Sequence, residues 1–503
     1  MRIETERDPE RLRQIALLLE KENHHLHRRL EELTRRLAAA TGTDAIAELQ
    51  LELKLLEEQL AHKNRELFGR SSEKRSSGPS TTTNGTATEP RTGHGPREQR
   101  ELPIVEHVHV LDEPDRVCPK CGGDLRAMAG QYEESEEVDV VARSFEIVRH
   151  KRQKYRCQCG ECVETALGPA KLIPGGRYSI NFAVEVAIAK YCDHLPLARQ
   201  VRQMKRAGLV TDTQTLWDQL FALYRHLAPI GDAIHALVLS APVVVADETR
   251  WPLLGEPGQS KWHAWAAASP EAISYRIEPS RSAEAARSVL GTYAGCVVAD
   301  GYGAYGALQE ALAAERAGPS FELAHCWVHC RRKFVEAEPH HPVATEMIDK
   351  IKLLYEAEAE VRDLPEPERR ARLGELRREK SKPIVDDIKA WVTTQSALPR
   401  SSLGKALAYT QSLWPGLVRF LGNPDIPLDT NAAERGMRAV AVGRKNHYGS
   451  RSERGTRVAA LFYTLIESAK LVSVEPAAYL AEATRRAIAA PGTITLPRDL
   501  AIA

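Results

Sequence analysis

The sequence lacks several features that would assign the protein to a particular environment. Only 9 of the 503 residues are cysteine, which argues against the disulfide framework of a secreted scaffold. Aromatic residues make up 6%, so a broad aromatic ligand groove is not expected. No apolar run reaches the roughly 18–20 residues of a membrane helix, and residues 1–14 lack the apolar stretch of a secretory signal. We therefore expect a cytoplasmic protein.

The chain also has almost no net charge, because 69 lysine and arginine residues are balanced by 68 aspartate and glutamate residues. The total therefore identifies no partner, and only local clusters of charge are informative. At about 100–200 residues per domain, the length predicts three or four domains. The order of the elements predicted below indicates a multidomain α+β protein.

Residues 1–70 are predicted to form a helical coiled coil. Leucine and isoleucine recur every three or four residues within 12–37 and 46–67. Another helix must cover so narrow an apolar seam, and we expect a homo-oligomer, with packing on the chain's own body as the alternative. Residues 71–100 contain almost no large apolar side chain and are predicted to be a flexible linker.

Residues 101–177 are predicted to form a zinc-ribbon DNA-binding module. Cys118 and Cys121 have the spacing at which two thiolates meet one tetrahedral ion. The second pair must come from CQCGEC, where Cys159 and Cys162 repeat that spacing and Cys157 is the alternative to Cys159. Four thiolates complete the coordination of zinc, which indicates a structural ion. Reduced bystander thiols and a redox pair are the other interpretations.

Two segments have the basic character of DNA contacts. The stretch between the two cysteine pairs is predicted to be a basic strand, with Arg149, Lys151, Arg152 and Lys154 as phosphate contacts, or alternatively a solvated face. Residues 178–240 are predicted to be helical. Two helices around the turn TDTQ are similar to a helix-turn-helix, although two ordinary packed helices give the same pattern. The predicted DNA contacts there are Arg202 and Lys205.

From residue 241 short β-branched runs alternate with helical segments, which predicts a mixed α/β layer. Strands are predicted at 243–246, 261–268, 273–277, 296–299 and 321–327, and a helix at 283–290. A charged helical block is predicted at 329–425, followed by helices at 431–442, 455–470 and 476–489. The α/β domain would thus comprise 241–328 and 426–472, with a helical insertion at 329–425 and a helical tail at 473–503.

Three carboxylates are candidates for catalysis. Asp247 and Asp300 each end a short apolar strand, and Glu434 lies in a predicted helix. A carboxylate at the end of a buried strand is a rigid ligand, and three hard oxygen donors suit two Mg²⁺ or Mn²⁺ ions. Two such ions support phosphoryl transfer. Spacing alone leaves open that the three acids are merely solvated or paired.

Basic residues near Glu434 favour a phosphate-backbone substrate. The predicted DNA contacts there are Arg435, Arg438, Arg444 and Lys445. A second cluster, at 325–333, combines histidine, cysteine and basic residues at the end of the fifth predicted strand. It has three interpretations: a second metal site, packing, or DNA contacts through His329, Arg331 and Arg332.

Together these segments resemble the DDE transposases of the insertion sequence sixty-six (IS66) type. The resemblance rests on LFGRSSEK at 67–74, CPKCGG at 118–123, YCDHLPLARQ at 191–200, ADET at 246–249, ADGYGAY at 299–305, CWVHCRRKF at 326–334 and DTNAAERGMRAVAVGRKN at 429–446. It implies an RNase H-like catalytic domain in which Asp247, Asp300 and Glu434 are the catalytic, metal-binding triad.

The resemblance further implies a bacterial, nucleoid-associated enzyme that cuts double-stranded DNA at the ends of its own mobile element. The freed 3′ hydroxyl would attack target DNA without a covalent enzyme intermediate. The implied cofactors are two Mg²⁺ or Mn²⁺ ions and one structural Zn²⁺, and the implied partners include accessory proteins encoded by the same element.

Three segments depart from the family pattern. Asp429-Thr430-Asn431 stands where many members have Asp-Asn-Asn, and His447-Tyr448-Gly449 replaces a more apolar stretch. The pattern CQCGEC leaves the fourth zinc ligand open. The rival functions are a non-catalytic DNA-binding regulator, a coiled-coil scaffold with an inactive enzyme relic, and, more distantly, a glycoside hydrolase using two carboxylates.

Overall fold

The structure, a computed structural model, describes residues 144–156, 163–255, 262–291, 293–316 and 320–501, with a few helical positions between 32 and 56. The chain divides into two units, one of residues 1–73 with 145–503 and the other of residues 74–144. The predicted linker, the zinc cysteines Cys118, Cys121, Cys157, Cys159 and Cys162, and nearly all of the predicted coiled coil lie outside the described residues. The linker, the zinc site and the coiled coil therefore stay predictions.

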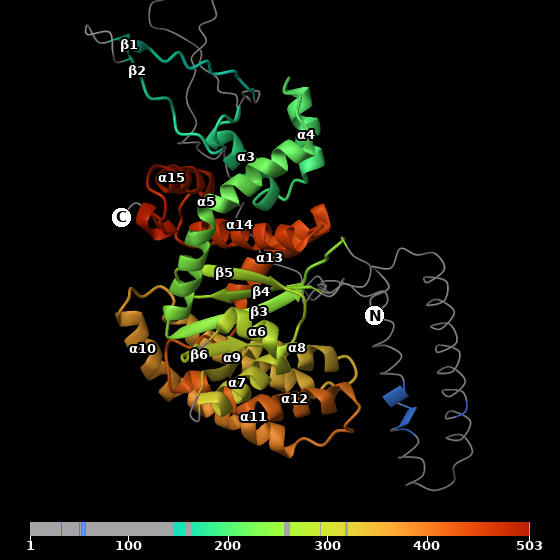
Figure 1. The fold of residues 1–503 in the computed structure, drawn as a ribbon. Helices are drawn as coiled ribbons and strands as arrows, with labels where there is room; N and C mark the ends of the chain where they lie inside the picture. The colour runs from blue at the N-terminus through green and yellow to red at the C-terminus, as the bar shows by residue number, and fades with distance from the viewer. Residues whose placement is uncertain are drawn as a thin grey trace, which may run out of the picture. The chain divides into compact units, whose positions relative to one another are not determined.

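A five-stranded mixed sheet forms the centre of the larger unit (Figure 1). Its strands lie in the order β5-β4-β3-β6-β7, the first three antiparallel and the last two parallel to β3. The bounds are β3 (Val243–Arg250), β4 (His263–Ala268), β5 (Ile273–Glu278), β6 (Cys296–Ala299) and β7 (Glu322–His325). The first four residues of β3 and all of β6 are buried, as expected for central strands covered on both faces.

Helices cover both faces and one edge of this sheet. α6 (Ala283–Leu290) packs on β4 and β5, and α7 (Gly303–Arg316) packs on α6 and β7. α13 (Asn431–His447) packs on β3 and β4 from behind the sheet in Figure 1. α14 (Glu453–Leu471) runs along the edge strand β5, where its hydroxyls accept hydrogen bonds from the backbone N–H groups that face away from β4.

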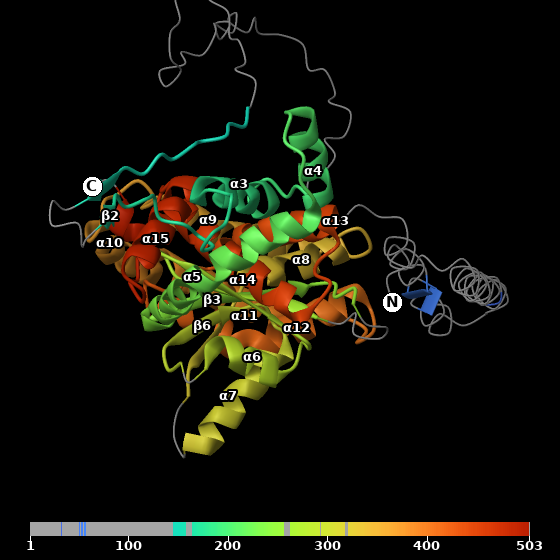
Figure 2. The same cartoon turned by 45° about the horizontal axis from the view of Figure 1, so that its top comes forward.

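A layer of helices lies beyond that edge. It contains α3 (Ile180–Tyr191), α4 (Leu197–Arg206), α5 (Thr213–Ser240) and α15 (Pro476–Ala489). Asp212 caps the N-terminus of α5, and its carboxylate accepts a hydrogen bond from Thr215 N at 2.8 Å. It then continues through Pro229 because its buried apolar residues pack against α3, α14 and β5 (Figures 1 and 2).

Between β7 and α13 the chain forms a block of helices. The bounds are α8 (Trp327–Ala337), α9 (Ala344–Ala359), α10 (Glu368–Leu376), the π-helical turn η3 (Arg377–Ser381), α11 (Lys382–Thr394), α12 (Ser402–Leu417) and the short turn η4 (Arg419–Leu421). α12 packs on α8 and β7, so the block is attached to the edge of the sheet opposite β5.

The predicted elements of the α/β part are present, but several differ in extent. The strand predicted at 243–246 continues to Arg250, so Asp247 lies within it and not at its end, and the helix predicted at 431–442 continues to His447. The helices at 283–290 and 476–489 and the strand at 296–299 have the predicted bounds. The strand predicted at 321–327 ends at His325, because Trp327 N bonds the carbonyl of Leu428 and Trp327 begins α8. The predicted basic strand is regular only over β1 (Lys154–Arg156), which pairs with β2 (Val163–Thr165). Among the described residues no helix is both long and apolar enough to span a membrane.

Candidate active site

Asp247 and Asp300 lie on neighbouring parallel strands. Asp247 is part of β3, and Asp300 directly follows β6. In the register of these strands Val245 lies opposite Val298, so each aspartate is two residues further along and both lie at the same end of the sheet. The Oδ1 atom of each accepts a backbone hydrogen bond of 2.9 Å, from Glu248 N and Tyr302 N respectively. Functional groups in α/β sheets commonly lie at this end of parallel strands.

Glu434 approaches the same region from α13. It lies in the first turn of this helix, which packs on β3 and β4. A Cβ atom at Gly436 would lie 2.5 Å from the ends of the Ile273 and Tyr275 side chains, so a larger residue there would have to displace them. Glu434 Oε1 is 3.2 Å from Thr430 Oγ1 and 3.8 Å from His329 Nε2. The Thr430 hydroxyl therefore orients the glutamate.

The charges of these acids act on one another. Burial raises the pKa of Asp247 to about 7, and the charges of Glu248, Asp300 and Glu434 raise it as well. Burial and the charge of Arg332 lower the pKa of His329, whereas Asp300 and Glu434 oppose that shift. The four side chains of Asp247, Asp300, Glu434 and His329 are thus close enough for their charges to interact.

The donor set of this neighbourhood suits hard divalent cations. As the structure places them, no three His, Cys, Asp or Glu side chains among the described residues lie close enough to form a ready-made metal site. The acids nevertheless supply carboxylate oxygens, which Mg²⁺ and Mn²⁺ prefer. Burial, and secondarily the nearby carboxylates, raise the pKa of Asp247, and a bound cation would oppose both effects.

Glu248 supports the strands that carry the two aspartates, and its position in the sequence did not indicate this role. Successive residues of a strand point to opposite faces, so Glu248 lies on the other face of the sheet from Asp247. Its side chain is 1% exposed, accepts a hydrogen bond from Tyr305 at 2.6 Å and pairs with Arg281. The Arg281 guanidinium lies 3.6 Å from the centre of the Tyr302 ring, and Tyr302 N bonds Asp300. This chain of contacts connects the two aspartate-bearing strands.

The His/Cys cluster after β7 is held together by packing. Cys326 Sγ lies 3.4 Å from Thr430 Oγ1, and Cys330 Sγ lies 3.1 Å from Thr410 Oγ1. Both thiols are buried, and burial raises the pKa of Cys330 to about 12. A neutral buried thiol is a poor metal ligand. The second-metal interpretation therefore finds no support among the described residues, and His329 is the member that faces the carboxylates.

The predicted DNA contacts differ in their surroundings. Exposed side chains are Arg149, Lys151, Arg152 and Lys154 around β1, Arg202 and Lys205 on α4, and Arg435, Arg438 and Lys445 on α13. His329, Arg331 and Arg332 on α8 are partly buried. Arg444 donates to Thr249 Oγ1 at 2.9 Å and to the carbonyl of Arg250. Arg444 thus has a structural contact with β3 that its position in the sequence did not indicate.

Comparison with known families gives two matches. Residues 175–458 match the model described as the transposase IS66 family, and this range contains Asp247, Asp300 and Glu434. Residues 115–160 match the model described as the zinc-finger binding domain of transposase IS66. That range contains Cys118, Cys121, Cys157 and Cys159 and ends before Cys162.

Three similar proteins come from Sinorhizobium fredii (strain NBRC 101917 / NGR234). Uncharacterized protein y4jD is 32% identical over 410 residues, which cover 76% of this chain and 77% of the relative. Uncharacterized protein y4hP is 30% identical over 407 residues, covering 76% and 72%. Uncharacterized protein y4qI is 32% identical over 399 residues, again covering 76% and 72%.

Proposed function

Because this chain belongs to the transposase IS66 family, we propose that it cuts DNA at the ends of a bacterial insertion sequence and transfers the cut strands into target DNA. The observation that carries the proposal is the position of Asp247 and Asp300 at one end of adjacent parallel strands, with Glu434 arriving on α13. Three antiparallel strands followed by two parallel ones also support an RNase H-like catalytic domain.

We assign Asp247, Asp300 and Glu434 as the catalytic residues and as ligands of two Mg²⁺ or Mn²⁺ ions. Such ions, when bound, supply the Lewis acidity that phosphoryl transfer requires. Thr430 and the Tyr302 N–H group orient two of the carboxylates. His329, whose pKa is lowered by burial, lies beside Glu434, where it would serve as a hydrogen-bonding group for DNA. Glu248 and Arg281 hold the strands that carry the aspartates.

The reaction consists of two phosphoryl transfers. Hydrolysis of a phosphodiester bond at the element end leaves a 3′ hydroxyl. This hydroxyl then attacks a phosphorus atom of the target, forming a new phosphodiester bond and releasing the 3′ oxygen of the target strand. The exposed residues Arg435, Arg438 and Lys445 would hold the phosphate backbone next to the carboxylates.

The N-terminal half would bind and assemble the DNA ends. We propose that Cys118, Cys121, Cys159 and Cys162 hold a structural zinc ion in a DNA-binding ribbon, that 71–100 is a linker, and that 1–70 joins copies of the chain. The exposed basic residues around β1 and on α4 would contact the element end. Helices α8–α12 would be an insertion in the catalytic domain.

The test separates cutting from binding. Asp247→Asn should abolish metal-dependent cleavage and strand transfer on a labelled element end while leaving its binding unchanged. Asp387→Asn, an exposed carboxylate in an ion pair on α11, is the matched control and should remain active. If the Asp247 variant still cleaves, or if it loses binding and cleavage alike, the assignment is wrong. Binding by the wild-type chain with no cleavage under any divalent metal would instead favour the regulator.

A further inference from the structure

Three aromatic side chains form a row on α5. Trp217, Phe221 and Tyr224 are spaced three and four residues apart, so they lie on one stripe of the helix. The planes of Trp217 and Phe221 differ by 13° with ring centres 6.4 Å apart, and those of Phe221 and Tyr224 differ by 9° at 5.8 Å. All three side chains are partly exposed. The rings are therefore nearly parallel to one another along one side of α5, and each of them remains partly exposed.

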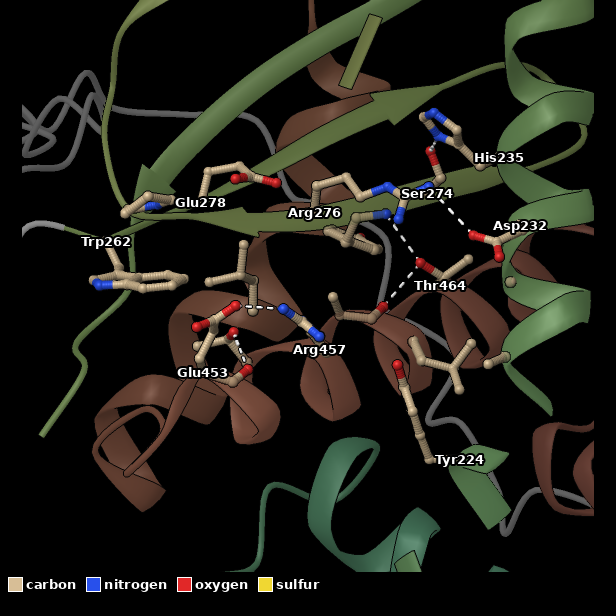
Figure 3. Close-up of a pocket in the computed structure, with 18 residues that line it drawn as sticks. Tyr224, Asp232, His235, Trp262, Ser274, Arg276, Glu278, Glu453, Arg457 and Thr464 are labelled. Atoms are coloured by element: carbon tan, nitrogen blue, oxygen red, sulfur yellow. Dashed lines mark hydrogen bonds and ion pairs between the residues drawn. The ribbon is translucent and has the colours of Figure 1, made fainter. Parts of the chain in front are cut away.

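The same stripe continues into a cavity between α5, β5 and α14. Ala228, Gly231 and His235 follow Tyr224 along the helix and line the cavity, whose volume is about 550 Å³. A Cβ atom at Gly231 would lie 2.4 Å from the end of the Leu461 side chain, so α5 and α14 pack closely at this point. Figure 3 shows Trp262 and Tyr224 on two sides of the space. The volume lies within the range of small-ligand sites, about 300–1,000 Å³.

Arginines accompany the aromatic row and the cavity. The guanidinium carbon of Arg454 is 5.0 Å from the centre of the Phe221 ring, and that of Arg225 is 6.0 Å away. Neither arginine has an ion-pair partner in the part of the chain that the structure describes. Arg457, one turn further along α14, lines the cavity and pairs with the exposed Glu453. Exposed pairs contribute little stability, so a phosphate would displace Glu453 at small cost.

The edge strand β5 beside the cavity is closed to an added β-strand. The N–H groups of Ile273 and Tyr275 on the edge strand are already bonded to Ser468 Oγ at 3.0 Å and Thr464 Oγ1 at 2.9 Å. A peptide therefore cannot extend the sheet at these positions, which removes a common mode of peptide binding. Between them, Ser274 Oγ bonds His235 Nδ1 at 2.9 Å and presents polar atoms to the cavity (Figure 3).

We propose that this surface, which we call the α5 groove (Trp217, Phe221, Tyr224, Arg225, Arg454, Arg457 and the adjoining cavity), binds unpaired nucleotides of DNA. Bases stack on the ring faces, one nucleotide enters the cavity, and phosphates pair with the arginines. Aromatic rings with adjacent cations are the usual means of holding single strands without reading their sequence. The proposal rests on the proposed function, because it assumes that the chain binds DNA. The groove lies at β5 and is separate from the carboxylates on β3 and β6.

The test measures binding in a full-length chain that carries Asp247→Asn, so cleavage does not enter the readout. The probes are a labelled thymidine oligonucleotide of about 12 residues and an abasic strand of the same length. We expect tighter binding of the thymidine strand. Tyr224→Leu and Trp217→Leu should each weaken it by about 5- to 100-fold and hardly affect the abasic strand, whereas Tyr224→Phe should stay within about twofold of the parent.

Charge is tested separately. Arg454→Gln, a change of an exposed side chain, should weaken both strands and reduce the salt dependence of binding, whereas Arg498→Gln, in an exposed ion pair elsewhere, should not. Thermal unfolding of each variant shows whether it is folded. If a leucine variant is not folded, the proposal is judged on the Arg454 variant and on the parent's affinities for the thymidine and abasic strands. Equal affinity for the thymidine and abasic strands would overturn the proposal, as would Arg454→Gln binding like the parent. Failure of the catalytic assignment would appear only in the cleavage assay.

Discussion

Asp247 and Asp300 are separated by the same 53 residues that separate Val245 from Val298, the paired positions of β3 and β6. The separation of the two acids in the sequence therefore equals the separation of paired residues in two parallel strands. Strand pairing places the second carboxylate beside the first, and the loop after β6 only has to orient it. Residues that stabilise the pairing of β3 and β6 should therefore affect the positions of both aspartates, even where they do not touch the carboxylates.

Glu248 is one such residue, and replacing it should destabilise the protein. Glu248→Gln removes the charge that compensates Arg281 but keeps the size of the side chain. We expect the free energy of unfolding to fall by about 1–3 kcal/mol, because a buried charge-assisted hydrogen bond is lost. Denaturant titration checks this, with Glu284→Gln in the exposed pair with Arg287 as the control. Equal denaturant concentrations at the midpoint of unfolding for the two variants would show that the Glu248 contacts do not stabilise the protein.

The strands could be predicted because their signal is local. VVVAD and CVVAD are β-branched runs ending in a carboxylate, and their residues alone indicate buried strands. The role of Glu248 could not be predicted in this way. It adjoins Asp247 in sequence, yet strand alternation directs it to the other face, where Tyr305 lies 57 residues away. The convergence of Glu434 with the aspartates was likewise an expectation from the resemblance and not from spacing.

The remaining differences also come from contacts between distant residues. Trp327 begins a helix because its N–H group and indole nitrogen bond the carbonyls of Leu428 and Leu417. The sequence predicts Arg444 as one of several basic DNA contacts, but its hydrogen-bond partner Thr249 is 195 residues away. The low aromatic content argued against a broad aromatic groove. It does not exclude a short row, which arises because Trp217, Phe221 and Tyr224 happen to share one stripe of α5.

The identity of the zinc ligands can be decided by substitution. We expect one zinc ion per chain, lost from Cys118→Ser, Cys121→Ser, Cys159→Ser and Cys162→Ser, because removing one of four thiolates opens the coordination sphere. Cys157→Ser should retain it, as should the control Cys192→Ser, which lies outside residues 101–177. Metal content of the purified variants provides the measurement. The family match ends at residue 160, so the informative alternative is zinc retained by Cys162→Ser and lost from Cys157→Ser.

Stability should fall in acid partly because of His447. Burial and the nearby charge of Lys190 lower the pKa of His447 to about 3, whereas an unfolded histidine titrates near 6.5. The unfolded chain therefore takes up this proton first, and stability is lost as pH falls from about 6.5 towards 3, by at most about 1.4 kcal/mol per pH unit. His447→Gln should flatten this part of the profile. A variant whose unfolding free energy followed the wild-type pH profile in parallel would contradict the prediction.

Arg377 should be a main support of the helical block between β7 and α13. Its side chain is 1% exposed, bonds Glu358 at 2.7 Å and donates to the carbonyls of Phe420 and Asn423 at 2.8 and 2.9 Å. Arg377→Met keeps much of the volume but leaves a partly buried carboxylate and two carbonyls without their donor. We expect a loss of about 3 kcal/mol in the free energy of unfolding.

The adjacent, exposed Arg378→Met is the control, because it should change stability by less than about 0.5 kcal/mol. Adding Glu358→Gln to Arg377→Met should restore part of the loss, since the uncompensated charge is then gone; no recovery would mean that the carbonyl contacts, and not the ion pair, hold this block together.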